Sequence, residues 1–163
     1  MEKIYSALGL MSGTSMDGVD ASIIQSNGET KYNVIFNKYF QYNEVIFKRL
    51  TDLRDKIITT KDLKNMSTEI KSLEREITTF HAQIVNKIIK KLKLKIDFVG
   101  FHGQTIFHNV DEKISKQLGD GNLLSQLTKK KVIYNFREND LQNDGEGAPL
   151  APIYHKLLVQ QLV

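Results

Sequence analysis

Residues 9–21 place a glycine-rich polar turn between two apolar segments, and this pattern constrains the fold more than any other part of the chain. Residues 4–11 are mostly apolar and lead directly into the turn, and residues 19–25 then alternate between apolar and polar. A plain hairpin needs only two turn residues. The longer turn predicts a strand, a ligand-binding loop and a second strand. Its candidate binding residues are Ser12, Gly13, Thr14, Ser15, Asp17 and Gly18.

The chemistry of this turn suits phosphate. Glycines let backbone N–H groups approach an anion closely, and the hydroxyl groups of Ser12, Thr14 and Ser15 add donors. Asp17 is the candidate ligand for Mg²⁺, which keeps several waters and takes few carboxylates. The alternative is a polar loop in which the glycines serve only the backbone geometry.

Composition indicates a soluble globular domain. The chain has 163 residues, of which 40% are hydrophobic and 26% charged, and it has no cysteine. No apolar run approaches the ~20 residues that cross a bilayer, and the N-terminus lacks a signal-peptide pattern, so we expect a cytoplasmic protein without membrane contact. The net charge of +4 comes from lysines near predicted helix ends, which argues against nucleic-acid binding.

The predicted elements alternate between strands and helices after an opening run of strands. The strands are residues 4–11, 19–25, 32–42, 96–101 and 132–136, and the helices are residues 43–58, 60–92, 123–131 and a last helix from Pro149, with Asn122 as a helix cap. This order predicts an α/β fold, a mixed sheet of five strands with helices on its faces. Ligands of such sheets bind beyond the carboxyl ends of the strands, so we expect one site built from three strand ends.

The second segment of that site follows the predicted strand 96–101. Gln104 and Thr105 have the groups to hydrogen-bond a polyol, and Gly103 lets the backbone reach a ligand. His102 is either a general base or a structural hydrogen-bonding residue, and the structural role is the commoner one for a lone histidine. The four histidines of the chain show no metal-ligand spacing.

The third segment is a predicted polar loop, residues 137–147. Arg137 is suited to clamp an anionic group, and Asp140 is suited to accept a proton from a hydroxyl or water. Spacing alone does not separate Asp140 from Asp144 or Glu146. The alternative is an acidic surface loop with glycine hinges.

Together these segments resemble anhydro-N-acetylmuramic acid kinase. The resemblance rests on Met11-Ser-Gly-Thr-Ser-Met-Asp-Gly-Val-Asp20 and Gly100-Phe-His-Gly-Gln-Thr-Ile-Phe-His108, and it continues in Gly119-Asp120, Asn135-Phe-Arg137, Asp140 and Gly147-Ala-Pro149. It implies one lobe, residues 1–163, of a two-lobe sugar kinase, with an RNase H-like half-domain and ATP with Mg²⁺ bound between the lobes. It also implies ring opening of 1,6-anhydro-N-acetylmuramic acid with phosphorylation to N-acetylmuramate 6-phosphate, a step of cell-wall recycling.

The resemblance assigns roles to individual residues. The turn 12–18 would face the ATP phosphates, and Asp140 would be the general base that activates water. Arg137, Asp120 and the segment from His102 to Thr105 would lie in the substrate cleft. One departure is the local negative charge of Glu138 and Asp144, which would oppose an anionic sugar unless both side chains point to solvent.

A second departure is length, because members of the family are roughly twice as long. We therefore expect the C-terminal lobe to be absent from this chain, and the chain to be inactive alone. The hypotheses are a kinase lobe completed by a separate chain or acting as a homodimer, a folded but non-catalytic remnant, and a stand-alone RNase H-like nuclease or nucleic-acid module. The nuclease needs several converging carboxylates.

Overall fold

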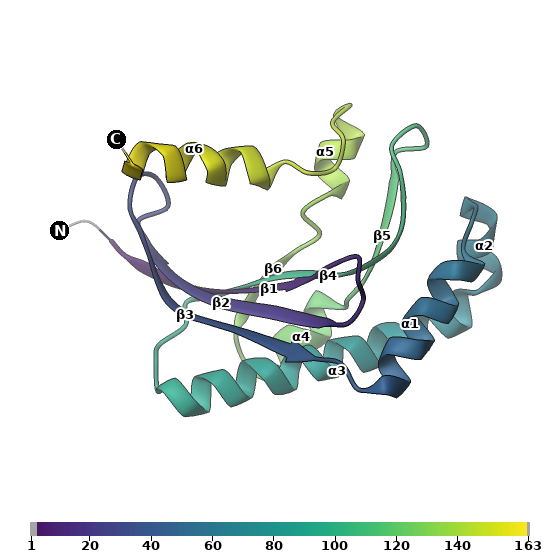
Figure 1. Cartoon of the computed structure of the whole chain (residues 1–163), viewed down its shortest axis with the longest axis horizontal. Coiled ribbons are helices and arrows are strands. Elements are labelled where there is room, and N and C mark those ends of the chain that lie inside the picture. The colour runs from purple at the N-terminus through teal and green to yellow at the C-terminus, as the bar shows by residue number, and fades with distance from the viewer. Residues whose placement is uncertain (1–2, 163) are drawn as a thin grey trace.

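Six strands form one mixed sheet in the computed structural model, which describes residues 3–162 (Figure 1). The predicted α/β class is confirmed, and the predicted count of five strands is corrected to six. The elements in chain order are β1 (Tyr5–Ser12), β2 (Gly18–Ser26), β3 (Tyr32–Gln41), α1 (Glu44–Lys56), α2 (Thr60–Asn65), α3 (Ser67–Leu92), β4 (Phe98–Asn109), β5 (Ile114–Leu118), α4 (Gly121–Thr128), β6 (Lys131–Tyr134), α5 (Glu138–Gln142) and α6 (Leu150–Leu162).

The strand order is β3-β2-β1-β4-β5, with β6 also paired to β4. β1 and β2 pair antiparallel, as do β2 and β3, whereas β1 and β6 both pair with β4 in parallel. The carboxyl ends of β1, β4 and β6 therefore point the same way, toward the edge where ligands of such sheets bind. This arrangement agrees with the RNase H-like half-domain that the resemblance implies.

The core lies between the sheet and a layer formed by α1, α3 and α4, which cover one face (Figure 1). Alternate residues of β1, Leu8 and Leu10, are buried on that face, as are Val99 and Phe101 of β4. The steps of three and four predicted for the long helix are present in α3, whose buried residues are Ile70, Leu73, Ile77, Thr78, His81, Ala82, Ile84, Val85 and Ile88. The α3 stripe therefore seals the central strands from solvent.

The opposite face of the sheet is much less covered. Met11, Tyr39 and Ile133 lie on this face and are each more than two-fifths exposed. Helix α6 lies above it near the turn between β2 and β3 (Figure 1), where the rings of Tyr32 and Tyr154 meet at 5.7 Å between centroids.

Two predicted boundaries are wrong in the centre of the chain. The strand predicted to end at residue 101 continues to Asn109, and the following polar stretch folds back as β5. The sequence of β5, Ile-Ser-Lys-Gln-Leu, is too polar to signal a strand, and its pairing with β4 overrides that propensity. As a result, residues 102–105 lie within a strand instead of in a loop.

The helices also differ in detail from the prediction. The helix predicted over residues 60–92 is broken at Met66 into α2 and α3. Asp120, and not Asn122, caps α4, because its side chain accepts a hydrogen bond from the Leu123 N–H at 2.9 Å. The predicted loop 137–147 contains the short helix α5. Within residues 3–162, no helix is both long and apolar enough to cross a membrane.

The first prediction concerns the helix that seals the sheet. Ile77 is fully buried at the centre of α3, so Ile77→Ala should lower the free energy of unfolding by about 2–5 kcal/mol through lost burial and a residual cavity. The measurement is urea unfolding followed by circular dichroism. Thr79→Ala, on the exposed side of the same helix, is the matched control and should change stability far less. Equal losses in both variants would contradict this placement of the core.

Candidate functional site

The turn at residues 12–18 has a buried start and exposed donor groups. Met16 adopts φ +60° and its side chain is buried, while its N–H donates to the Gly13 carbonyl at 3.2 Å. With Met16 held in the core, the side chains of Thr14, Ser15 and Asp17 are left exposed. These three groups, together with the turn's backbone, are the part of the predicted phosphate site that a ligand reaches.

Ser12 lies below this surface. It is 2% exposed, and its Oγ lies 3.0 Å from the Tyr42 hydroxyl and 3.2 Å from His81 Nε2. The neighbouring carbonyl of Gly13 accepts a hydrogen bond from Gln104 Nε2 at 2.8 Å. The Ser12 hydroxyl is therefore engaged inside the protein, whereas the prediction placed it on the phosphates.

Sequence reasoning missed Tyr42 and His81. The available signal was weak, since His81 is one polar residue on the apolar stripe of a long helix. Burial lowers the pKa of His81 to about 4, so the ring is neutral at pH 7. Burial also raises the pKa of Tyr42, so its phenol stays protonated.

Asp17 is a fitting but solitary carboxylate for a cation. The Ser15 hydroxyl donates to Asp17 Oδ1, and this hydrogen bond holds the pKa of the carboxyl below its usual range. Within residues 3–162, no group of three His, Asp or Glu side chains lies close enough together to hold a metal ion. A single carboxylate suits Mg²⁺ that arrives with nucleotide phosphates and keeps its waters, and it does not suit a metal held by protein groups alone.

A second cluster forms around Arg137, at the start of α5. Arg137 Nε donates to His102 Nε2 at 2.9 Å, and Arg137 Nη1 donates to the Gly147 carbonyl at 2.8 Å. The Gly147 N–H donates in turn to Asp140 Oδ2 at 2.7 Å. Arg137 and Asp140 are thus held by the same residue, Gly147, through its carbonyl and its N–H, so this segment lies in one cluster with His102.

Two glycines allow this approach. Gly147 adopts φ +77°, a backbone region that side chains disfavour. A Cβ added at Gly145 would lie 2.3 Å from Asp140 Oδ2 and 2.4 Å from its Cγ. Any side chain at residue 145 would therefore displace the Asp140 carboxylate.

The hydrogen bonds of His102 define its role. Nδ1 lies 2.8 Å from the Gly103 carbonyl and must donate to it, which leaves Nε2 as the acceptor for Arg137. Burial is the main cause that lowers the pKa of His102, and the Arg137 charge adds to it. Because its free lone pair is taken by Arg137, the geometry favours the structural alternative for His102 over the general base.

The remaining predicted residues are spread around this cluster. Gln104 is fully buried and supports the turn, and its Oε1 is a buried acceptor without a partner among the described residues. Thr105 is half-buried and accepts a hydrogen bond from Gln117 Nε2 at 3.3 Å. The carboxylate of Asp120 caps α4 by accepting a hydrogen bond from the Leu123 N–H. Substrate contacts by these residues stay predictions.

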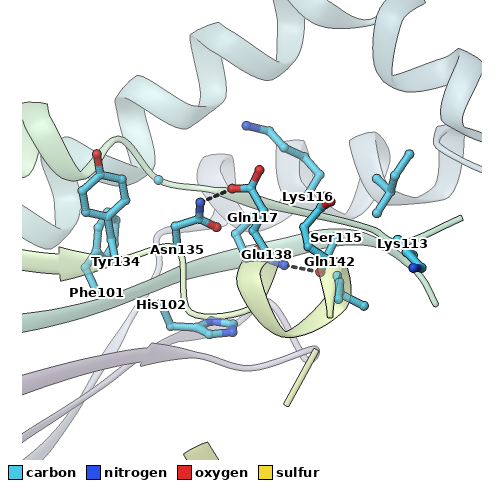
Figure 2. Close-up of a pocket in the computed structure, with 13 residues that line it drawn as sticks. Phe101, His102, Lys113, Ser115, Lys116, Gln117, Tyr134, Asn135, Glu138 and Gln142 are labelled. Atoms are coloured by element: carbon cyan, nitrogen blue, oxygen red, sulfur yellow. Dashed lines mark hydrogen bonds between the residues drawn. The ribbon is translucent and has the colours of Figure 1, made fainter. Parts of the chain in front are cut away.

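A polar cavity of about 400 Å³ lies beside His102, between β5 and α5. Figure 2 shows Gln117 and Lys116 of β5 and Asn135 and Glu138 near α5 along its wall. The size and the mixture of donors and acceptors suit a small polar ligand.

The local negative charge that the sequence placed here is largely neutralised or exposed. Asp144 pairs with Lys113 at 2.6 Å, and Glu138 is exposed and accepts a hydrogen bond from Asn135. The predicted conflict with an anionic ligand is therefore relieved at Asp144 and remains at Glu138, which lines the cavity beside His102.

Strand β4 connects the two clusters. Its Gln104 reaches the turn at Gly13, and its His102, two residues earlier, reaches Arg137. The three segments predicted to form one site therefore meet through a single strand.

Comparisons with known proteins agree with the resemblance. The family described as anhydro-N-acetylmuramic acid kinase matches residues 5–162. A protein of that name from Pelagibacter ubique is 65% identical over 161 residues, which make up 99% of this chain and 43% of that protein. Those from Agrobacterium fabrum and Rhizobium etli are 36% and 35% identical, and the matches cover 44% of each. The chain thus spans less than half the length of these curated relatives.

The second prediction concerns the neutral His81. Its folded pKa of about 4 lies below the ordinary 6.5, so between these pH values the unfolded chain binds the proton and the folded chain does not. Stability should be full above pH 6.5 and should fall as the pH drops toward 4, with a His81 contribution of about 3 kcal/mol. Urea unfolding across this range measures it.

His81→Gln, which does not titrate, should remove most of that pH dependence. His102→Gln is the comparison variant. The pKa of His102 is also lowered, but by less than that of His81, so His102→Gln should remove a smaller part of the pH dependence. An unchanged pH dependence in His81→Gln would show that His81 is not the buried titrating group.

Proposed function

This chain belongs to the anhydro-N-acetylmuramic acid kinase family, and we propose that it forms the N-terminal lobe of an ATP-dependent kinase acting on 1,6-anhydro-N-acetylmuramic acid. The observation that carries the proposal is the convergence of a donor-rich turn and an Asp140–Arg137 cluster on one strand. Phosphoryl transfer needs mainly positioning and charge neutralisation, and this set of groups provides both.

The turn is the proposed phosphate site. Exposed Thr14 and Ser15 would donate to phosphate oxygens along with the turn's backbone, and exposed Asp17 would hold Mg²⁺ or its water shell. Gly18 is buried and lets β3 approach the turn, because a Cβ there would lie 2.4 Å from the Phe40 carbonyl oxygen. When bound, ATP with Mg²⁺ supplies the phosphoryl group and neutralises part of its charge.

Asp140 is the proposed general base. Its Oδ2 is held by the Gly147 N–H, and its Oδ1 accepts no hydrogen bond among the described residues. Oδ1 would take the proton of a water that attacks the anomeric carbon of the sugar. The bond from that carbon to the 6-oxygen would break, and the 6-oxygen would take the γ-phosphoryl group of ATP, with ADP as the leaving group. Arg137, fixed by His102, places positive charge beside the sugar carboxylate.

The cavity beside His102 is the proposed position of the sugar. It meets the Arg137 cluster through His102 and offers Gln117, Ser115 and Asn135 to sugar hydroxyls. Asp140 lines a separate hollow with Gly145 and His155, so the sugar would have to extend toward Asp140 for the base to act on it. From β4, Phe101 and His102 line the cavity beside His102, whereas Gly103 and Thr105 do not. Asp120 would act on it only through the position of α4.

We propose that turnover also needs a part corresponding to the region of the relatives that lies beyond the matched residues. Family kinases of this class bind ATP between two lobes, and closure supplies orientation and excludes water. The missing part would come from a separate chain or a longer form of this protein, and a homodimer is the remaining arrangement. A two-metal nuclease has no supporting donor cluster in residues 3–162.

The third prediction tests this function directly. The purified chain with Mg²⁺, ATP and 1,6-anhydro-N-acetylmuramic acid should give no phosphosugar by mass spectrometry. Addition of the C-terminal part of the Pelagibacter relative, in trans or as a fusion, should restore product, and Asp140→Asn should abolish it. Product from the chain alone, absent in Asp140→Asn, would show that one lobe suffices. Failure of every fusion would favour the non-catalytic remnant.

The fourth prediction uses the contact between Gly145 and Asp140. In the active fusion, Gly145→Ala should lower kcat about 10²-fold or more, because the new methyl group displaces the base from its productive position. Gly9→Ala is the matched control, since its added Cβ would have no contact closer than 3.8 Å. Equal kcat values for the two variants would mean that Asp140 is not positioned as the structure has it.

A further inference from the structure

We infer that His81 is a positioning residue for the turn 12–18, acting through the Ser12 hydroxyl. The inference rests on the proposed phosphate-binding role of that turn, and it assigns a function to a buried histidine that the proposed reaction does not use. His81 lies on α3 and touches no exposed part of the site.

The hydrogen bonds around His81 have only one consistent direction. Its Nδ1 lies 2.8 Å from the Ile77 carbonyl, which only accepts, so Nδ1 carries the hydrogen. In a neutral ring Nε2 is then bare, and the Ser12 hydroxyl 3.2 Å away must donate to it. The lone pairs of Ser12 Oγ remain, and the Tyr42 hydroxyl donates to one of them at 3.0 Å. This series of hydrogen bonds runs from Tyr42 through Ser12 and His81 to Ile77.

Burial keeps this series of hydrogen bonds in one protonation state. His81 is fully buried, Ser12 is 2% exposed and Tyr42 is 4% exposed. The rings of Tyr42, Phe80 and Phe101 surround His81 with centroids between 4.9 and 6.5 Å from its own. The lowered pKa of His81 and the raised pKa of Tyr42, both caused mainly by burial, keep each group in the protonation state that the chain requires.

The hydrogen bonds of Tyr42 reach both ends of the turn. The Tyr42 hydroxyl holds Ser12 at the start, and the Tyr42 N–H donates to the Asp17 carbonyl at 2.8 Å near the end. Gln104 holds the Gly13 carbonyl between them. His81 thus accepts the hydrogen of Ser12 and is itself held by the Ile77 carbonyl, so it fixes the position of the start of the turn. Thr14 and Ser15 stay exposed for the ligand.

This assignment gives Ser12 a different task from the other hydroxyl residues of the turn. Its hydrogen is directed to His81, so it has none to donate to phosphate. Removal of the acceptor would leave the buried Ser12 hydrogen unpaired, and the start of the turn would move to find a partner.

The first test needs no variant. The ring ¹⁵N signals of His81 in the intact chain should show a protonated Nδ1 and a bare Nε2 at pH 7. A protonated Nε2, or a ring that titrates near pH 6.5, would overturn the inference, because the Ser12 hydroxyl would then lack its acceptor.

The second test compares two substitutions of similar size. His81→Leu removes the acceptor, whereas His81→Gln keeps an oxygen that accepts from Ser12. In ¹H–¹⁵N spectra of the intact chain, amides 13–17 should shift and exchange faster in His81→Leu and return toward wild type in His81→Gln. Affinity for Mg²⁺·ATP, followed on the same amides, should fall about tenfold in His81→Leu and be restored in His81→Gln.

The outcomes separate the two proposals. Wild-type amides and affinity in a folded His81→Leu variant would overturn the positioning role and leave the proposed function intact. If Mg²⁺·ATP shifts none of these amides even in the wild-type chain fused to the C-terminal part of the Pelagibacter relative, the proposed phosphate role of this turn fails, and the amide exchange alone decides whether His81 positions it. If His81→Leu does not fold, Tyr42→Phe removes the first donor of the chain and should loosen the same amides, and an unchanged turn would overturn the inference.

Discussion

The parallel pairing of β1 with β4 is the constraint on which the rest of this structure depends. It joins strands far apart in sequence, with Leu8 opposite Val99 and Leu10 opposite Phe101. These four residues are buried and form the sheet side of the core that α3 covers. Because β1 and β4 run in the same direction, the turn after β1 and the polar residues of β4 reach the same edge. A shift of one residue would turn Leu8 and Leu10 to the open face, so the buried pattern fixes the register and with it the site.

The site is built mostly from groups that a ligand would never touch. His102 fixes Arg137, the backbone of Gly147 binds both Arg137 and Asp140, and Tyr42 and Gln104 hold the turn. Arg137 and Asp140 are therefore held by His102 and Gly147, and the backbone of the turn is held by the buried Tyr42 and Gln104. This is the arrangement expected where catalysis depends on orientation more than on unusual reactivity.

The sequence indicated the fold class and the three segments of the site, because strand periodicity and turn composition are local signals. Local reasoning failed where tertiary pairing decides the outcome. The polar β5 is a strand because the extended β4 provides a partner, and Asp120 is a helix cap because α4 begins two residues earlier than the Asn122 signal implied. His81 and Tyr42 were missed because their importance comes from meeting Ser12 across 69 and 30 residues of chain, which no spacing rule reveals.

Strand β4 carries Gln104 and His102 two residues apart, and each belongs to a different half of the site. Neighbouring residues of a central strand separate from the sheet together, as one cooperative unit. Local separation of β4 from the sheet would therefore break both the contact between Gln104 and Gly13 and the contact between His102 and Arg137. The two halves of the site should therefore be ordered or disordered together, and a molecule with an ordered turn and a disordered Asp140 should be rare. A substitution in β4 that alters one half should also affect the other.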